Sequence, residues 1–313
     1  MSIVPFGNTD LCPEINTLTE RITGAIGTLW RPLDTLIEAD VESTKTRAAG
    51  EIELEGVRTR AVERLAAEET KKQQNLEAIY GKAFQLLEPG VDSATIAKMD
   101  DDWIVFHSEK ARLVSDKEMQ TLWAKVMAKE ALVPGSFCKR TLETLSVLEK
   151  QEAHWFTAVC QFLVKHSRGV SLVIKKEEGG LEVAKVYSDA GINFARLKHL
   201  TTIGLVEFTY PMLTDNLGYY DEPTIQLSYF EDQRTFRMSK THAFRGKYVV
   251  RFGYAALTKV GGELAKIAGS TPIPGFFDFL EAVWEKDGIF RVRLQEAMKS
   301  AIQSSHDEDQ KRS

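Results

Sequence analysis

The residues that most invite a chemical role are three consecutive carboxylates, Asp100, Asp101 and Asp102, with His107 close behind them. Carboxylate and imidazole groups ligate metal ions and carry out acid–base catalysis. Neighbouring residues on a helix do not face one another, however, and carboxylates at a helix start are stabilised by the positive end of the helix dipole. We therefore interpret the three aspartates as a helix start and predict no metal site, no cofactor and no catalytic residue here.

A second candidate site is a helix that should begin at Asn193, a good N-cap residue, and end before Gly204, which suits the left-handed position after a helix. Its polar side chains could contact nucleic-acid bases or a protein surface. They are Asn193, Arg196, Lys198, His199 and Thr202.

The third candidate is the segment from Gln233 to Arg251, which contains no acidic residue and interleaves Phe236, Phe244 and Tyr248 with cations. Cations on a hairpin with aromatic side chains suit phosphate contacts and base stacking. The cations are Arg234, Arg237, Lys240, Arg245, Lys247 and Arg251. A solvated hairpin face, balanced by acidic residues at 221–222 and 231–232, explains the same pattern, so protein contact and nucleic-acid contact both remain open.

Familiar enzyme signatures are missing from the sequence. There is no phosphate-binding glycine loop, no G-x-S-x-G and no H-E-x-x-H. The histidines are scattered, and Cys12, Cys138 and Cys160 lie far apart, as expected for reduced thiols in a cytosolic protein. The chain is therefore predicted to be non-enzymatic, with a toxin or nuclease of unfamiliar site as one alternative.

The elements that would position the second and third candidates follow one another in a particular order. A helix carrying Trp155 and Val159 ends near His166, a strand covers 171–174, and the helix at Asn193 ends in I-G-L-V. A strand follows at 205–208, another at 248–256, and then the pattern L-T-x-x-G-x-x-L from Leu257, with Thr258 as a helix cap.

This order resembles a winged helix-turn-helix domain over residues 150–269. Such domains place a recognition helix in the major groove and a wing on the DNA backbone. The departure is the long insertion between the two strands, which holds the acidic loop TDNLGYYDEP and a further strand pair at 225–230 and 235–239. The predicted fold is mainly α with a small α+β module.

The first half is predicted to be helical. Residues 1–32 hold an amphipathic helix from Pro13 to Trp30, whose apolar stripe should dock on the helical core or on a second copy. A membrane-surface role is disfavoured because its polar face has little Lys or Arg. Residues 33–88 form a long, charged helix that would act as a stalk for oligomerisation, since a helix this polar rarely stands alone.

Residues 91–149 form a helical core in which Trp103, Phe106 and Trp123 supply large apolar surfaces. Ser115 and Glu118 predict a capping box for one helix, and Ser136, after Pro134-Gly135, predicts the cap of the next. Residues 270–303 should form C-terminal helices, the last from Ile289 to Ile302, and a disordered tail is expected at 304–313.

Composition narrows the function classes further. The net charge of −5 argues against binding nucleic acid over the whole surface, although it allows a local basic patch. No stretch is apolar enough to span a membrane, and no secretory signal is evident, so a cytoplasmic protein is expected.

Three stretches carry a family resemblance: Arg64–Ile79, Asp100–Trp103 and Glu118–Ala153. Together with an I-G-x-L-W-x-P-like start at Ile26–Pro32 and the later L-T-x-x-G-x-x-L, they resemble a bacterial family of unknown function. The L-W-A-x-[ILV]-[ML]-A core at Leu122–Ala128 is also distantly similar to the abortive-infection alpha proteins. The resemblance implies a protein of prophages and other mobile elements that is associated with defence against phage, and it implies no catalytic residues.

The sequence thus favours a cytoplasmic, oligomeric, non-enzymatic phage-defence protein that binds a partner, DNA or a phage or host protein, through its winged-helix-like half. The first alternative is a DNA-binding transcriptional regulator, which would read bases with 193–202 and clamp the backbone with the basic hairpin.

Overall fold

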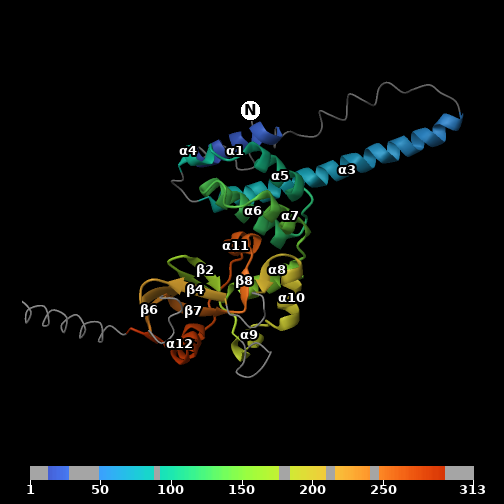
Figure 1. Cartoon of the computed structure of the whole chain (residues 1–313). Helices are drawn as coiled ribbons and strands as arrows, with labels where there is room; N and C mark the ends of the chain where they lie inside the picture. Colours follow the sequence, from blue (N-terminus) through green and yellow to red (C-terminus); the bar gives the residue numbers. More distant parts are fainter. Residues whose placement is uncertain are drawn as a thin grey trace, which may run out of the picture. The chain divides into compact units, whose positions relative to one another are not determined.

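The computed structural model describes residues 13–27, 49–87, 92–175, 184–208, 216–239 and 247–292, with side chains from Glu55 onward in the second of these ranges. Contacts between Cα atoms divide the chain into two units, residues 1–150 and 151–313 (Figure 1). The first unit is helical, and the second combines helices with small antiparallel sheets. The structure is therefore mainly α with a small β module, as predicted.

Unit 1 is built from helices of very different length. They are α1 (Pro13–Ile26), α3 (Ala49–Leu86), α4 (Ser93–Ile96), α5 (Asp101–Ala111), α6 (Lys117–Leu132) and α7 (Lys139–Val147). Helix α1 docks on this core, because Leu18 and Ile22 are fully buried and Arg21 pairs with Asp101 at 2.6 Å. The predicted extension of α1 to Trp30 lies outside the described residues.

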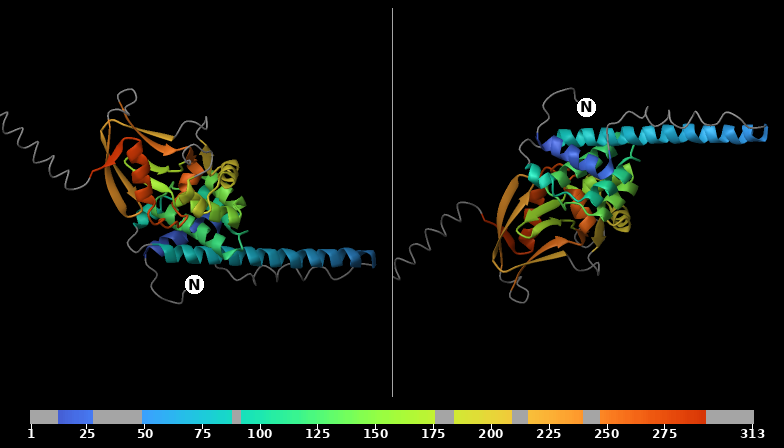
Figure 2. Two further views of the ribbon diagram at one scale, coloured as in Figure 1. Left: turned by 90° about the horizontal axis from the view of Figure 1, so that it is seen from below. Right: turned by 90° about the horizontal axis from the view of Figure 1, so that it is seen from above.

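Helix α3 changes character along its length. Its C-terminal half packs on α6 and buries Ile79, Tyr80, Ala83 and Phe84. Its N-terminal half reaches beyond the other described helices of unit 1 (Figure 2), and Val57, Val62 and Leu65 are at least half exposed there. The predicted long helix is confirmed from Ala49 on, while its expected start at 33–48 lies outside the described residues.

The helix starts of unit 1 show which cap predictions hold. Asp100 caps α5, because its carboxylate accepts the Trp103 N–H at 2.7 Å. The capping box at Ser115 is wrong: Asp116 is the cap of α6, and its carboxylate accepts two backbone N–H groups, those of Glu118 and Met119. A carboxylate is the stronger acceptor at the positive end of a helix.

The turn between α6 and α7 is organised by a residue that the sequence patterns did not single out. Buried Glu130 accepts the N–H groups of Gly135 and Phe137. Ser136 does not cap α7, as had been predicted; its hydroxyl donates to the Val133 carbonyl at 2.6 Å, and α7 begins after Cys138.

Unit 2 contains five helices and nine strands within the described residues. The helices are α8 (Lys150–Cys160), α9 (Lys185–Asp189), α10 (Phe194–Thr202), α11 (Lys259–Ala265) and α12 (Phe276–Lys286). The strands are β1 (Leu163–His166), β2 (Gly169–Leu172), β3 (Val206–Phe208), β4 (Asn216–Tyr220), β5 (Thr224–Tyr229), β6 (Asp232–Met238), β7 (Tyr248–Gly253), β8 (Ala255–Leu257) and β9 (Ile289–Arg291).

The largest sheet has the strand order β2-β1-β5-β6-β9, and every neighbouring pair is antiparallel. Alternate residues of β5 and β6 are buried, including Leu227, Tyr229 and Phe236. Helix α12 covers this face, because Phe277 and Trp284 contact the ring of Phe236. The predicted pairing of 225–230 with 235–239 is confirmed.

Two further strand pairs are β3–β8 and β4–β7, and the first of them joins the two glycine-containing sequence patterns. Thr258 caps α11 by accepting the Gly261 N–H, and its hydroxyl donates to the Gly204 carbonyl at 2.6 Å. A Cβ on Gly261 would lie 2.0 Å from the Leu205 carbonyl oxygen, so a side chain does not fit there. I-G-L-V and L-T-x-x-G-x-x-L are therefore two sides of one packing contact.

Three element predictions in unit 2 are wrong. The helix expected to end near His166 stops at Cys160, and β1 follows. The strand expected at 248–256 is two strands, which divide at Gly253, where φ is +135° and a Cβ would meet the Ile174 carbonyl oxygen at 2.1 Å. The helix expected from Ile289 begins instead as β9, and the rest of it from residue 293 lies outside the described residues. The tail at 304–313 also lies outside them.

Candidate functional site

The five residues predicted as a reading surface do not all face solvent. Asn193 caps α10 by accepting the Arg196 N–H at 2.9 Å. The Arg196 guanidinium donates to the Gly191 carbonyl and stands 5.4 Å from the Trp155 ring centre. His199 Nε2 lies 2.6 Å from Glu152 Oε1. Only Lys198 and Thr202, one turn apart, are exposed without a side-chain partner among the described residues.

The predicted basic hairpin from Gln233 to Arg251 does not form. Its two ends lie in β6 and β7, and β6 pairs with β5 and β9 whereas β7 pairs with β4. Arg237 and Arg251 are exposed, and Lys247 lies 3.4 Å from an Asp221 carboxylate oxygen. Lys240 and Arg245 lie outside the described residues. The arginines of β6 and β7 therefore lie in different sheets, and their regular spacing in the sequence does not place them on one surface.

His166, to which the sequence patterns gave no role, lies beside a serine in an arrangement that resembles the His–Ser dyad of a hydrolase. His166 Nε2 lies 3.0 Å from Ser171 Oγ, and its Nδ1 lies 3.0 Å from the Tyr220 hydroxyl. Nδ1 also accepts the Arg168 backbone N–H at 3.3 Å. An acceptor Nδ1 places the ring proton on Nε2, which then donates to Ser171 and has no lone pair to activate its hydroxyl.

Burial lowers the pKa of His166, and the nearby Arg168 lowers it further, so this ring stays uncharged at neutral pH. The constellation is consistent with a structural role, tying the β1–β2 turn to β4 and β7, where the ring also stacks on Phe252 at 5.2 Å.

His107 in unit 1 is also structural. Its ring is fully buried, stacks on Trp103 at 5.3 Å and donates from Nε2 to the Trp123 carbonyl at 3.3 Å. Burial lowers the pKa of His107 to about 4, against the opposite effect of that hydrogen bond. Among the described residues, no group of three or more His, Cys, Asp or Glu side chains is placed to hold a metal ion.

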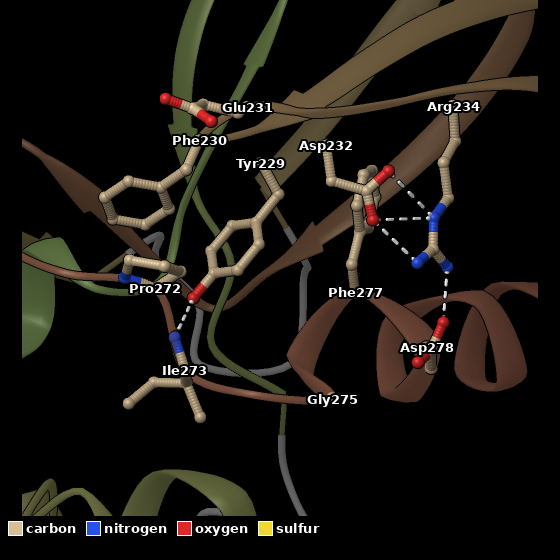
Figure 3. A pocket seen from close by; sticks show the side chains of 10 residues that line it. All are labelled: Tyr229, Phe230, Glu231, Asp232, Arg234, Pro272, Ile273, Gly275, Phe277 and Asp278. Atoms are coloured by element: carbon tan, nitrogen blue, oxygen red, sulfur yellow. Dashed lines mark hydrogen bonds and ion pairs between the residues drawn. The ribbon is translucent and has the colours of Figure 1, made fainter.

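The feature of unit 2 best suited to a ligand is a surface pocket of about 510 Å³ (Figure 3). It lies between the β5–β6 turn and the loop that leads into α12. Its lining residues are Tyr229, Phe230, Glu231, Asp232, Arg234, Pro272, Ile273, Gly275, Phe277 and Asp278. Binding sites for small molecules occupy roughly 300–1,000 Å³, so the volume suits one or two side chains of a partner.

Two glycine-like backbone conformations shape the pocket rim. Phe230, in the two-residue connection between the paired Tyr229 and Asp232, has φ of +51°, although it is not glycine. This left-handed conformation costs an ordinary residue about 1–2 kcal/mol. Gly275, with φ of +75°, stands at the start of α12. Strain that the surrounding structure maintains is often found at binding sites.

The floor of the pocket is held by Tyr229. Its hydroxyl donates to the Gln161 carbonyl at 2.9 Å and accepts the Ile273 N–H at 2.7 Å. The hydroxyl thus uses its donor and one acceptor site in these two hydrogen bonds. Burial raises the pKa of Tyr229, so this phenol remains neutral. The hydroxyl therefore positions the loop before α12 and is not available as a nucleophile.

Arg234 forms the opposite wall, with its side chain only 9% exposed. Its guanidinium pairs with Asp232 at 2.7 Å, with Asp278 at 2.7 Å and with Glu281 at 2.8 Å, and it stands 4.5 Å from the Phe277 ring centre. Burial alone lowers the pKa of Arg234, but the bonds to Asp232 and Asp278 outweigh it and raise the pKa above its ordinary value. Arg234 is thus a permanent charge fixed within the protein.

Phe230 and Glu231, in contrast, face outward. The Phe230 ring is 42% exposed and meets Tyr229 edge-on with ring centres 5.0 Å apart. Glu231 is exposed and has no hydrogen-bond or ion-pair partner within the part of the chain that the structure describes. The pocket therefore presents the exposed ring of Phe230 and the carboxylate of Glu231, which is unpaired among the described residues, to a ligand.

Sequence reasoning placed Arg234 among nucleic-acid contacts and treated Glu231 and Asp232 as counter-charges. The sequence did contain a hint of this pocket. Two aromatic and two acidic residues, Tyr229–Asp232, stand at the turn after β5, and P-G-F-F-D at 274–278 begins α12. What joins them is the packing of α12 on β5 and β6, which no local pattern reports.

The helices of the described chain include none that is both long and apolar enough to cross a membrane. Neither the curated proteins nor the solved structures contain a match to the chain. A family model described as a protein of unknown function, DUF2806, matches residues 59–281, more than two thirds of the chain, including the whole pocket. The chain therefore belongs to the DUF2806 family.

Proposed function

We propose that this protein is a cytoplasmic, non-enzymatic binding protein of the phage-defence type, which assembles through α3 and recognises a partner protein through unit 2. The observation that carries the binding role is the pocket at Phe230. It combines an exposed aromatic ring, a strained backbone and a carboxylate that has no partner among the described residues, and Arg234 joins its two sides through ion pairs to Asp232 and Asp278.

The chemistry of the pocket favours binding over catalysis. Its lining residues include no Ser, Thr, Cys, His or Lys, and the one hydroxyl, that of Tyr229, is engaged in two hydrogen bonds. Asp232 and Asp278 both pair with the Arg234 guanidinium at 2.7 Å, which is a structural use of these carboxylates.

The defence role rests on the sequence resemblance of Leu122–Ala128 to abortive-infection alpha proteins. Its test is plaque formation on bacteria that express the chain, challenged with a panel of phages. We expect fewer plaques for at least one phage than with an empty vector. Equal plaque counts for every phage in the panel would overturn the defence role.

Assembly is proposed for the exposed half of α3. Val57, Leu65 and Val62 are each at least 50% exposed, and they follow one another in that order around one side of α3, within roughly 140°. Exposed apolar residues on one side of a projecting helix suit a second copy of the same helix. Arg64 and Glu68, already paired at 2.6 Å, lie beside Val57 at one edge of this side.

The assembly test uses point variants, since α3 also supplies core residues such as Tyr80 and its deletion would unfold unit 1. We expect light scattering to give a multiple of 35.2 kDa for the wild type and 35.2 kDa for the triple variant Val57→Glu, Val62→Glu, Leu65→Glu. The matched control changes three exposed residues elsewhere in unit 1, Leu113, Val133 and Val147, to Glu. A wild type that is already monomeric would refute assembly.

A second candidate is the DNA-binding regulator. The observation in its favour is the helix pair α9 and α10, joined by a short turn containing Gly191 with φ of +79°, and followed by the β3–β8 pair. Lys198 and Thr202 are its exposed candidates. DNA affinity should then fall steeply with added salt and collapse in the variant Lys198→Glu, Arg237→Glu. No detectable duplex binding at low salt would eliminate this candidate.

A further inference from the structure

We propose that the pocket at Phe230 receives a lysine or arginine side chain from a partner protein. This inference rests on the proposed binding function and specifies the chemistry of the partner.

The first argument is charge. The lining contains the three carboxylates of Glu231, Asp232 and Asp278 against the single guanidinium of Arg234. The local charge is therefore negative, so a phosphate group would be repelled and a cation attracted. Asp232 is committed to Arg234, but Glu231 is unpaired among the described residues, and Asp278 is 73% exposed.

The second argument is the aromatic face. Cations bind the faces of aromatic rings at distances up to about 6 Å. The pocket already contains one such pair, in which the Arg234 guanidinium stands 4.5 Å from the Phe277 ring centre. Phe230 offers a second ring, 42% exposed, and Glu231 follows it on the same β5–β6 turn with an exposed carboxylate (Figure 3). A cation at this turn would be attracted by the ring and by the carboxylate.

The third argument is the shape of the site. Its lining combines the apolar side chains of Pro272, Ile273 and Phe277 with charged side chains. Lysine and arginine side chains have this same combination, with an apolar stem and a charged head. An open pocket of about 510 Å³ also leaves room for an apolar residue beside the cation. A protein segment fits these features better than a small amine, which would leave the apolar lining uncovered.

The test measures fluorescence anisotropy of two labelled peptides with the full chain. One peptide alternates leucine with arginine, and the other alternates leucine with glutamate. We expect only the arginine peptide to bind. Glu231→Gln and Phe230→Asn should each weaken binding about threefold, and the double variant about tenfold. Asparagine tolerates a left-handed backbone, so Phe230→Asn removes the ring without a new strain.

The matched control is Glu222→Gln, which makes the same charge change beyond the far end of β5, at an exposed carboxylate without a partner in the described part of the chain. Binding should be unchanged in this variant. Equal weakening by Glu222→Gln and Glu231→Gln would show bulk charge attraction and overturn the inference. So would tighter binding of the glutamate peptide, or binding of arginine amide as tight as that of the peptide. Unaltered unfolding midpoints in all variants would show that the fold is retained.

The inference and the proposed function fail in different ways. Normal plaque counts together with peptide binding that depends on Glu231 would remove the defence role and keep the cation pocket. Reduced plaque counts together with peptide binding that ignores Phe230 and Glu231 would keep the defence role and remove the pocket assignment.

Discussion

Two regions of this protein each pack a nitrogen-containing side chain against aromatic residues, and the charge of that side chain differs between them. In unit 1, Trp103, Trp123 and Tyr80 enclose His107, which is fully buried. In unit 2, Phe277 and three carboxylates hold Arg234 at the wall of an open pocket. The histidine is kept uncharged, whereas the arginine keeps its charge.

The difference is set by counter-charge. Burial without a partner of opposite sign disfavours the charged form of a group, and His107 has no carboxylate among the side chains that contact it in the described structure. Arg234 is nearly as buried but has three carboxylates within 2.8 Å. An aromatic cluster is therefore a packed core in one unit and part of a candidate binding site in the other.

The largest expected loss of stability comes from a substitution in the aromatic cluster around His107. Trp123→Ala would leave a cavity beside His107 and remove one of the largest fully buried side chains. We expect a loss of about 3–5 kcal/mol in the free energy of unfolding, measured by urea denaturation. A loss below 1 kcal/mol would show that unit 1 repacks and that its cluster is not a rigid core.

A smaller effect should come from protonation of His107. Its pKa is about 4 in the folded state and about 6.5 when unfolded, so the unfolded chain binds the extra proton first as pH falls. This contribution to stability is complete above pH 6.5 and is lost as pH falls toward 4. It should amount to about 2 kcal/mol between pH 7 and pH 5.

The measurement compares the wild type with His107→Phe, which fills the site without a titrating group. Unfolding free energies at pH 7 and pH 5 should fall more in the wild type, by that amount. The same pH dependence in both proteins would mean that His107 is not held uncharged, and the contrast with Arg234 would disappear.

The smallest effect separates two arginines on β6. Arg234→Leu removes a guanidinium from three carboxylates, two of which are more than 40% exposed and can turn to water. We expect a loss of about 1–2 kcal/mol. The matched variant is Arg237→Leu, at an exposed position of the same strand, which should change stability by less than about 0.5 kcal/mol. Equal effects would show that the Arg234 network does not brace the pocket.

Local patterns predicted much of the helical half and little of the candidate site. The caps at Asp100, Asn193 and Thr258 were predictable, because capping depends on hydrogen bonds within a few residues. The strand pair β5–β6 followed from periodicity. The helix predicted at Asn193 formed, but Arg196 lies over the Trp155 ring and the exposed His199 pairs with Glu152, and both partners are far away in the sequence.

The amino-acid sequence by itself determined most of the helical segments of unit 1, where several helices begin, and which family the chain belongs to, because these depend on neighbouring residues and on matching patterns. Only the tertiary structure decided that β6 and β7 lie in different sheets and that the loop before α12 meets the β5–β6 turn. Strand partners and ion pairs join residues that are distant along the chain, and many pairings satisfy the same alternation. Arg234 and Arg237, three positions apart on β6, lie on opposite faces of the strand, and only the packing of α12 decided that Asp278 and Glu281 meet the face that holds Arg234.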